Sequence, residues 1–510
     1  MSNSHQLKTG VILSYLSLFI GNLISLFYTP VMLRLMGQSE YGLYIFVSSF
    51  VGYLGLMDLG FGSTYIRFYT QFKYSKSTND VERLNGFFLV IFSVIAFLVI
   101  LCGCVMFTYS KQFFGGKLTD GELLLSRKLL IILIIQLSLS FIGKIFVMFI
   151  TANERFIFLK GMGIIRNVLN PMVMFPLLLM GYRSLAMVIL SLILEILYYS
   201  LCFWYSIIHL NFKASLGKIG NQLGYSIMEV SVFVFIGGIV DQLNWNVGKY
   251  ILGKCRGAIP VAIFGVASQL AYYFRIFASS ISSVFIPRVN KIVATGDSNR
   301  ELTDLMIRVG RVQFMILSLA CTGFIFFGQQ FCILWAGKDY AMVYPMALCM
   351  MIPLIIPLIQ NIGPYILIAR KRHKARSVIY LIIALCNLGI CVPLCIKYGG
   401  IGCAIATGLS LILGNGIFIN WYYSHIGLEI VRYWNNIIKL ALKSLIIPIM
   451  AGIGFLLLEL PVRWDVFFIK CSLYSILFSL SLFYLGCNAE ERRLAIGWID
   501  RFWKQWKQVN

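Results

Sequence analysis

The chain has 510 residues, of which 59% are hydrophobic and only 12% are charged, and its mean hydropathy is +0.84. Because soluble proteins carry roughly 25% charged residues, this composition excludes an ordinary soluble domain and predicts an all-α protein that crosses a lipid bilayer many times. The net charge of +23 does not indicate a nucleic-acid partner. The basic residues lie in short connections between apolar runs, as residues that set membrane topology do.

Apolar runs of about 20 residues, long enough to cross roughly 30 Å of hydrocarbon, follow one another along the chain. The first run is too long for a signal peptide and lacks a small-residue cleavage site, so it is predicted to be a membrane helix. The tenth contains several prolines and is expected to be kinked or broken. The sequence predicts about fourteen spans, at residues 11–35, 42–66, 85–108, 126–150, 161–181, 184–208, 223–250, 258–287, 309–330, 341–369, 377–396, 400–423, 438–458 and 465–486.

Basic residues divide unequally between the two alternating sets of connections. The richer set holds roughly 27 of them and the poorer set roughly 12, so the richer set is predicted to be cytoplasmic, with both termini inside. The richer set includes residues 67–83, 155–160, 213–218, 288–311, 370–374 and 492–507. The largest groups of the poorer set are at 111–128 and 249–256.

An internal repeat divides the chain. Asn170 and Pro176 recur as Asn387 and Pro393, an offset of about 217 residues, and Ser-Leu-Ile-Leu at 191–194 recurs at 410–413. The stretch from 34 to 67 also returns, at 251–288. An offset of six helices keeps both copies in one orientation, so parallel repeats are expected. The predicted domains are therefore two six-helix lobes, 1–215 and 216–425, and two extra helices with a basic cytoplasmic tail, 426–510.

Two such lobes facing one central cavity are typical of alternating-access transporters. The alternative is a pair of bundles with a structural role only. A charge deep in a membrane is costly and usually faces a cavity or a partner. Asp58, Glu195 and Arg275 lie near the middle of the second, sixth and eighth predicted helices. Lys144, Arg166 and Lys470 lie nearer the interfaces, where their charges can reach water.

Arg275 is the strongest candidate for substrate binding, because its planar guanidinium can donate two hydrogen bonds to a phosphate or diphosphate and keeps its charge. The repeat places Asp58 at a similar depth in the other lobe, so the two are expected near one cavity. Asn22, Asn361 and Asn415 are expected as polar lining of that cavity, or as interhelical hydrogen bonds. Either reading fits the sequence.

The seventh predicted helix carries Asp241, Asn244 and Gly248 on one face. A carboxylate and an amide so placed could bind a cation or carry a proton, or they could cap a kink near Gly237. Asp241, Asn244 and Glu195 are therefore the candidates for coupling to an ion or proton gradient.

The sequence contains no pattern typical of an enzyme. It lacks a Walker A motif, its 4 histidines are dispersed, and its 13 cysteines form no metal-ligand spacing. We therefore predict no catalytic residues, no metal site and no cofactor.

Three loose motifs carry a family resemblance. They are LMGQSEYGLY with DLGFGSTYIRF in the first copy of the repeat, NWNVGKYILGK at 244–254 leading into VAIFGVASQL, and YGGIGCAIATGLS at 398–410. With the repeat, they cover roughly residues 8–425. The chain resembles the polysaccharide (O-antigen or capsule repeat-unit) flippases of the multidrug/oligosaccharidyl-lipid/polysaccharide (MOP) exporter superfamily.

The resemblance implies a V-shaped pair of lobes in a bacterial cytoplasmic (inner) membrane. Its substrate would be an undecaprenyl-diphosphate-linked oligosaccharide, moved from the cytoplasmic to the outer leaflet, with Arg275 where relatives use an arginine for the diphosphate. A polysaccharide polymerase and glycosyltransferases would be partners. One departure is that Arg34 and Arg67 lie at helix ends, which argues against a peptidoglycan precursor as substrate. The alternatives are a cation-coupled multidrug exporter of the same superfamily and a non-transporting membrane scaffold of a glycan synthase.

Overall fold

The computed structural model describes residues 3–74, 78–115, 117–217, 221–296, 298–458 and 460–493, and all regular elements in these ranges are helices. Twelve helices are long and apolar enough to cross a membrane, and a pair bent by 45° raises the number to thirteen. The predicted all-α multi-pass fold is confirmed. The seventh predicted span corresponds to α9 and α10, which are not among those spans. Part of the predicted basic tail, 494–510, lies outside the described residues.

The described chain forms two compact units by its internal contacts. Unit 1 is Met1–Ser268 with Tyr380–Thr407, and unit 2 is Gln269–Ile379 with Gly408–Asn510. The division falls inside three helices, α11 (Ala258–Ser283), α16 (His373–Tyr398) and α17 (Gly400–Leu411), which contribute to both units. The boundaries near 215 and 425 that the repeat suggests stay a prediction.

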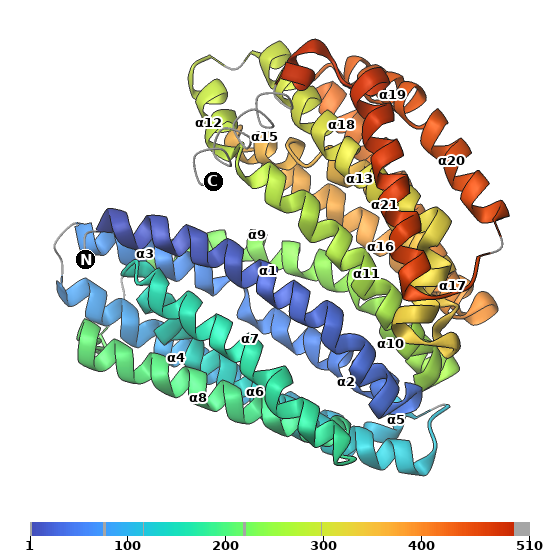
Figure 1. Cartoon of the computed structure of the whole chain (residues 1–510). Coiled ribbons are helices and arrows are strands. Elements are labelled where there is room, and N and C mark those ends of the chain that lie inside the picture. Colours follow the sequence, from blue (N-terminus) through green and yellow to red (C-terminus); the bar gives the residue numbers. More distant parts are fainter. Residues whose placement is uncertain are drawn as a thin grey trace, which may run out of the picture. The chain divides into compact units, whose positions relative to one another are not determined.

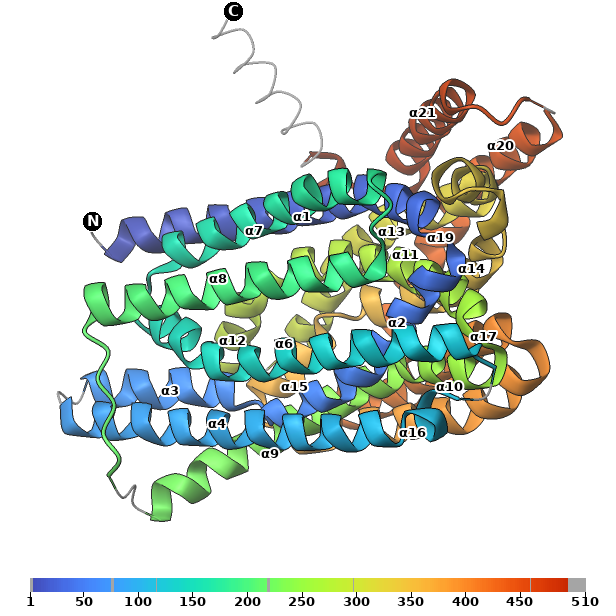
Figure 2. The same cartoon turned by 90° about the horizontal axis from the view of Figure 1, so that it is seen from below.

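Unit 1 is a bundle in which α6 packs along both α4 and α8, and α1 packs along α7 (Figures 1 and 2). Close packing requires glycine at some of these contacts: a Cβ on Gly143 of α6 would lie 2.2 Å from the ring of Tyr199 on α8. The helices wholly in unit 1 are α1 (Asn3–Met36), α2 (Gln38–Leu54), η1 (Gly55–Asp58), α3 (Phe61–Tyr74), α4 (Thr78–Thr108), α5 (Ser110–Phe114), α6 (Asp120–Ala152), α7 (Phe156–Leu179), α8 (Ser184–Leu210), α9 (Asn221–Trp245) and α10 (Val247–Arg256).

Unit 2 is built around the long helix α13, which contacts α14, α19, α20 and α21. Its apolar core joins Phe327 of α13 to Tyr474 and Phe478 of α21. The helices wholly in unit 2 are α12 (Ile286–Ala294), α13 (Asn299–Ala336), η2 (Lys338–Tyr340), α14 (Val343–Ile359), α15 (Gly363–Ala369), η3 (Ile412–Phe418), α18 (Ile419–His425), α19 (Ile430–Ser444), α20 (Ile446–Leu457), α21 (Trp464–Ser481) and η4 (Leu482–Gly486).

The proline-rich tenth predicted helix is broken, as expected. It ends at Ile359 and resumes at Gly363, and Gln360 to Ile362 form the connecting turn. The thirteenth predicted span is bent between α19 and α20. A π-helical segment, η3, interrupts the twelfth.

The repeat seen in the sequence has a counterpart in the backbone. Four turns in the left-handed region of φ recur after about 217 residues each time. In the clearest pair, Glu154 (φ 58°) and Lys371 (φ 55°) each end a helix, and the next residue's N–H donates to the carbonyl five residues earlier. The pairs are Gly37 with Gly257, Glu154 with Lys371, Gly181 with Gly399, and Asn211 with Gly427. The same local turns therefore close corresponding helices in both copies.

Connections in unit 1 alternate between its two ends. At one end, Ser39 donates to Glu122 at 2.5 Å, and the Arg256 guanidinium donates to the Ile396 carbonyl at 2.5 Å. At the other, Lys73 donates to Asn153 at 2.7 Å. The first end carries the connections that are poorer in basic residues, and the second end carries the richer ones. This alternation supports helices that cross the membrane, and which end faces the cytoplasm stays a prediction.

Candidate functional site

The second predicted span is interrupted in its middle. Helix α2 ends at Leu54, a 3₁₀ turn carries Asp58, and Leu59 (φ 47°) and Gly60 (φ 71°) turn the chain into α3. A non-glycine residue in the left-handed region costs free energy and persists only where the surroundings hold it. Such breaks in membrane helices free polar backbone groups, which occur at membrane depth only inside protein or beside a polar cavity.

Asp58 forms an ion pair inside unit 1. Its carboxylate lies 2.7 Å from Nζ of Lys144 on α6, and the two side chains are 25% and 37% exposed. The sequence suggested that Lys144 reaches toward the interface, and it left Asp58 either on the substrate cavity or in a pair with an internal partner. The structure pairs the two with each other, and the place of Asp58 on a substrate cavity stays a prediction. Because both are partly exposed, the pair is less costly to desolvate than a fully buried one.

A pocket of about 290 Å³ lies inside unit 1 between α2, α6 and α8. The polar residues that line it come from each of these helices at one-turn spacing, so each helix presents one polar face. They are Tyr44, Ser48, Gln136, Ser140, Ser191 and Glu195. The pocket is thus an open hollow in which polar side chains of three helices lie among apolar ones.

Glu195 is the acidic residue that lines this pocket. Its carboxylate accepts a hydrogen bond of 2.5 Å from the Gln136 amide. Gln136, Ser140 and Lys144 lie four residues apart on one face of α6, so the face that serves Glu195 also carries the partner of Asp58. A carboxylate with a neutral amide partner can bind a proton without breaking an ion pair.

A second polar network joins α2 to the seventh predicted helix. Gln242 of α9 donates to the Gly52 carbonyl at 3.1 Å and accepts from Asn246 at 2.5 Å. Lys249 of α10 donates to the Asn246 side chain at 3.1 Å. Helix α9 continues through Gly237 and ends at Trp245, so its interruption lies at Asn246 rather than near Gly237.

The two predicted coupling residues of this helix, Asp241 and Asn244, lie in different environments. Asn244 accepts a hydrogen bond of 3.3 Å from the Asn387 amide, which ties α9 to α16. Asp241 is exposed. Asn244 therefore makes an interhelical hydrogen bond, a role that the sequence did not suggest for it, and its role in coupling stays a prediction. The role of Asp241 in coupling stays a prediction.

Arg275 lies in the unit 2 part of α11 and is half-buried. Its guanidinium stacks on the ring of Tyr272 at 5.4 Å, one turn earlier. An aromatic face holds the guanidinium plane in one orientation, and a guanidinium donates hydrogen bonds from the edge of that plane. The predicted role in diphosphate binding stays a prediction.

Unit 2 has a buried amide cluster at its two helix irregularities. Gln360, at the break after α14, donates to the Asn420 side chain at 2.6 Å, and the Asn420 amide donates to the Asn415 carbonyl in η3 at 3.1 Å. Asn415 is only 3% exposed. It therefore packs inside unit 2 rather than on an open cavity wall, while Asn361 in the adjacent turn and Asn22 of α1 are half-buried.

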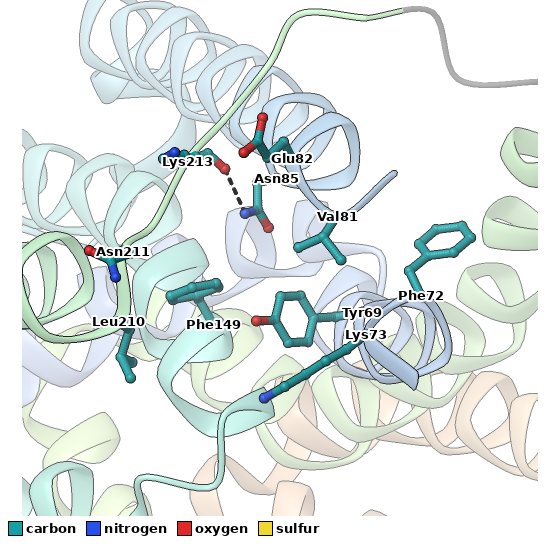
Figure 3. Close-up of a pocket in the computed structure, with 10 residues that line it drawn as sticks. All are labelled: Tyr69, Phe72, Lys73, Val81, Glu82, Asn85, Phe149, Leu210, Asn211 and Lys213. Atoms are coloured by element: carbon teal, nitrogen blue, oxygen red, sulfur yellow. Dashed lines mark hydrogen bonds between the residues drawn. The ribbon is translucent and has the colours of Figure 1, made fainter. Parts of the chain in front are cut away.

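A further pocket, of about 230 Å³, lies at the end of unit 1 that carries the richer set of connections (Figure 3). Asn85 donates to the Lys213 carbonyl at 2.8 Å and accepts from Tyr65 at 2.7 Å. The Ser215 N–H donates to the Glu82 carbonyl at 2.9 Å. These bonds hold the segment after α8 against α4. We therefore assign this pocket a structural role, as the place where that segment packs.

Sequence reasoning missed the neutral partners. Gln136, Gln242 and Gln360 each carry a central hydrogen bond, yet an isolated glutamine in an apolar run gives no signal of its partner. Spacing offered one hint, since Gln136 and Lys144 lie on one face of α6. In the described part of the chain, no group of three or more His, Cys, Asp or Glu side chains could hold a metal ion.

Comparisons with known proteins identify the fold. No known protein family and no curated protein matches the sequence. The structure is similar to the lipid II flippase MurJ in an inward closed conformation, with a TM-score of 0.74 and 17% identity over 92% of this chain and 98% of that chain. It is also similar to an inward-facing multidrug resistance MATE family transporter of the MOP superfamily, with a TM-score of 0.66 and 10% identity over 82% of this chain and 98% of that chain.

A third similar structure is a MOP superfamily transporter from Pyrococcus furiosus, described as having a binding pocket of reversed polarity, with a TM-score of 0.55 and 12% identity over 83% of this chain and 95% of that chain. At these identities the likeness concerns the fold, and these structures are transporters and flippases rather than enzymes. The chain is a multi-pass membrane protein with the fold that MOP superfamily transporters share.

Proposed function

We propose that the chain is a lipid-linked oligosaccharide flippase that moves undecaprenyl-diphosphate-linked polysaccharide repeat units from the cytoplasmic to the outer leaflet by alternating access. One observation carries the choice between flippase and drug exporter. The likeness to the lipid II flippase extends over 92% of this chain, against 82% for the multidrug transporter. The family resemblance of the sequence motifs supports the same substrate class.

In this proposal Arg275 receives the diphosphate. The substrate carries its negative charge at the junction of a polar sugar chain and an apolar polyprenyl tail. An arginine oriented by an aromatic ring on a membrane helix suits such a group, because two parallel N–H donors match two phosphate oxygens. The sugars would occupy polar space in the protein while the tail stays in lipid.

Glu195 supplies the coupling step in this proposal. Its neutral partner, Gln136, lets the carboxyl group gain or lose a proton as the pocket is exposed to one side or the other. Protonation removes the cost of a charge at membrane depth. A proton gradient could thereby bias the cycle toward the outward-facing state.

The test is flipping activity in proteoliposomes, measured as access of an undecaprenyl-diphosphate-linked oligosaccharide to an impermeant probe, together with surface polysaccharide in a strain that lacks the gene. Arg275→Ala should abolish both while the protein remains in the membrane, and Arg275→Lys should retain part of the activity. Arg183→Ala is the matched control, because this exposed arginine makes only a 3.9 Å contact with Glu40. Normal polymer with Arg275→Ala would contradict the role of Arg275.

The second candidate is a cation-coupled multidrug exporter, because the chain also shares the fold of the multidrug transporter, over 98% of that chain. It predicts raised drug resistance on expression and no polysaccharide defect on deletion. The two outcomes exclude each other, so one pair of strains separates them.

A further inference from the structure

Four of the 13 cysteines gather at one end of unit 1. Cys391 and Cys395 lie one turn apart on α16, and Cys403 lies in the first turn of α17 or just beyond it. Cys255 lies at the end of α10. All four belong to unit 1. The sequence indicated only that the cysteines form no metal-ligand spacing, since these four are dispersed along the chain.

The turn between α16 and α17 brings three of these thiols together. Gly399 adopts φ 64°, and a Cβ on Gly402 would lie 2.0 Å from the Leu394 carbonyl oxygen and 3.1 Å from the Cys395 nitrogen. The two backbones are therefore in direct contact beside Cys395. The Cys403 thiol donates to the Gly248 carbonyl, with sulfur and oxygen 3.7 Å apart, and it lies close enough to the Cys391 and Cys395 thiols to interact with both. All three side chains are at most 1% exposed.

Cys255 connects this buried trio to the surroundings. The neighbouring Arg256 donates to the Ile396 carbonyl at 2.5 Å, which fixes the end of α10 against the end of α16. Cys255 is half-buried, and burial together with the nearby Cys395 raises the pKa of its thiol, against the opposing effect of Arg256. It is thus the most accessible thiol of the cluster, with modest intrinsic reactivity.

The cluster lies at the end of unit 1 that carries the poorer set of basic connections, which the charge distribution assigns to the outer face. A Cβ on Gly257, beside the cluster, would lie 3.5 Å from the carbonyl of Lys117 in another connection of that set. Thiols at the outer face of a bacterial inner membrane meet an oxidising compartment.

We propose that this thiol cluster is an oxidisable site in which Cys395 and Cys403 form a disulfide. The oxidant is a disulfide, either of a thiol oxidoreductase or of a small molecule. The Cys255 thiolate attacks one oxidant sulfur and releases the other as a thiol. Cys395 then attacks the Cys255 sulfur and releases the second oxidant thiol, and Cys403 finally attacks Cys395 and regenerates the Cys255 thiol.

The step balances, because two protein thiols give up two electrons and two protons and one oxidant disulfide becomes two thiols. The product joins α16 and α17, two of the three helices that contribute to both units. A covalent tie across their turn removes freedom from an element that the two units share. Oxidation is therefore expected to change the transport rate.

The experiment uses the full-length protein in right-side-out membrane vesicles. A disulfide oxidant that cannot cross the membrane is added, free thiols are blocked under denaturing conditions, and peptides are mapped by mass spectrometry. We expect the 395–403 disulfide in the wild type and its loss in both Cys395→Ala and Cys403→Ala. Cys102→Ala is the control, because Cys102 lies outside the cluster and should leave the disulfide unchanged.

Cys255→Ser should slow formation of the disulfide several-fold without changing its final amount. Wild-type protein in which Cys395 and Cys403 both remain alkylatable after oxidation would overturn the proposal. An unchanged rate in Cys255→Ser would overturn the relay. Mapping of the wild type needs no variant, so a folding defect in a variant does not prevent a result.

Discussion

Two acids of unit 1, Asp58 and Glu195, have partners of different charge on one face of α6. Asp58 lies 2.7 Å from the Lys144 ammonium, in a break of a membrane helix. Glu195 lines a pocket and accepts a hydrogen bond of 2.5 Å from the neutral Gln136 amide. The first acid contacts a cation, and the second contacts a neutral amide.

In the proposed transport cycle, the difference would separate a structural acid from a proton carrier. An ion pair resists a change of protonation, because neutralising either member leaves the charge of the other unpaired at membrane depth. An acid beside an amide can exchange a proton at lower cost, since the amide can turn to donate or accept. We therefore propose that the Asp58 pair holds the break between α2 and α3 and that Glu195 is the acid that takes part in transport.

The largest effect is expected for Glu195→Gln. This change keeps the shape and the hydrogen bond but removes the exchangeable proton, so transport should fall by about 100-fold, the lower range for loss of a positioned proton-transfer group. The measurement is proton-driven flipping in proteoliposomes. Glu40→Gln is the control and should keep its rate. Wild-type activity in Glu195→Gln would show that the two acids do not differ in this way.

Breaking the Asp58 pair should affect stability more than transport. Asp58→Ala or Lys144→Ala leaves one charge unpaired, and since both side chains are partly exposed we expect a loss of about 1–3 kcal/mol, below that of a fully buried pair. Thermal unfolding in detergent measures it. The double variant Asp58→Asn with Lys144→Met should regain more than half of the loss. Additive losses would contradict a direct pair.

Gln242→Leu tests what holds the break in which Asp58 lies. It removes the hydrogen bond to the Gly52 carbonyl and leaves Asn246 without its acceptor. We expect a loss of about 1 kcal/mol, measured by thermal unfolding. Gln360→Leu in unit 2 is a comparison of the same kind. If Gln242→Leu is silent, the break is held by packing alone.

The smallest effect on stability is expected for a third acid, Glu491. It follows the last span and pairs with Arg311. Burial raises its pKa, but the two hydrogen bonds from Arg311, at 2.7 and 2.8 Å, and one from the Asn488 N–H lower it below its usual value. A lowered pKa means stability that is present above the unfolded-state pKa and is lost as the pH falls through the folded-state pKa. The protection of α21 amides against hydrogen exchange, corrected for the slower intrinsic exchange in acid, should therefore fall on acidification.

Glu491→Gln should exchange faster at neutral pH and lose most of that pH dependence. Glu490→Gln is the matched control, because the Arg308–Glu490 pair is 54% and 62% exposed and should contribute little. Equal pH dependence in both variants would contradict the assignment.

The sequence could predict which segments span the membrane because hydropathy needs no knowledge of partners. It also located the break in the tenth helix, since proline acts on its own backbone. It could not predict that Lys144 pairs with Asp58, because the two are far apart in the chain and a lysine near a helix end is equally able to reach water. The roles of Arg275 and Asp241 stay predictions for the same reason.

By itself the sequence determined the helical class, the order of the spans and the internal repeat, whose turns recur as left-handed residues such as Glu154 and Lys371. These follow from local physics, namely apolar length, backbone strain and charge in connections. Only the tertiary structure decided which acid is paired, which faces an amide, and which thiols meet. Those outcomes depend on contacts between distant helices, which one sequence does not encode position by position.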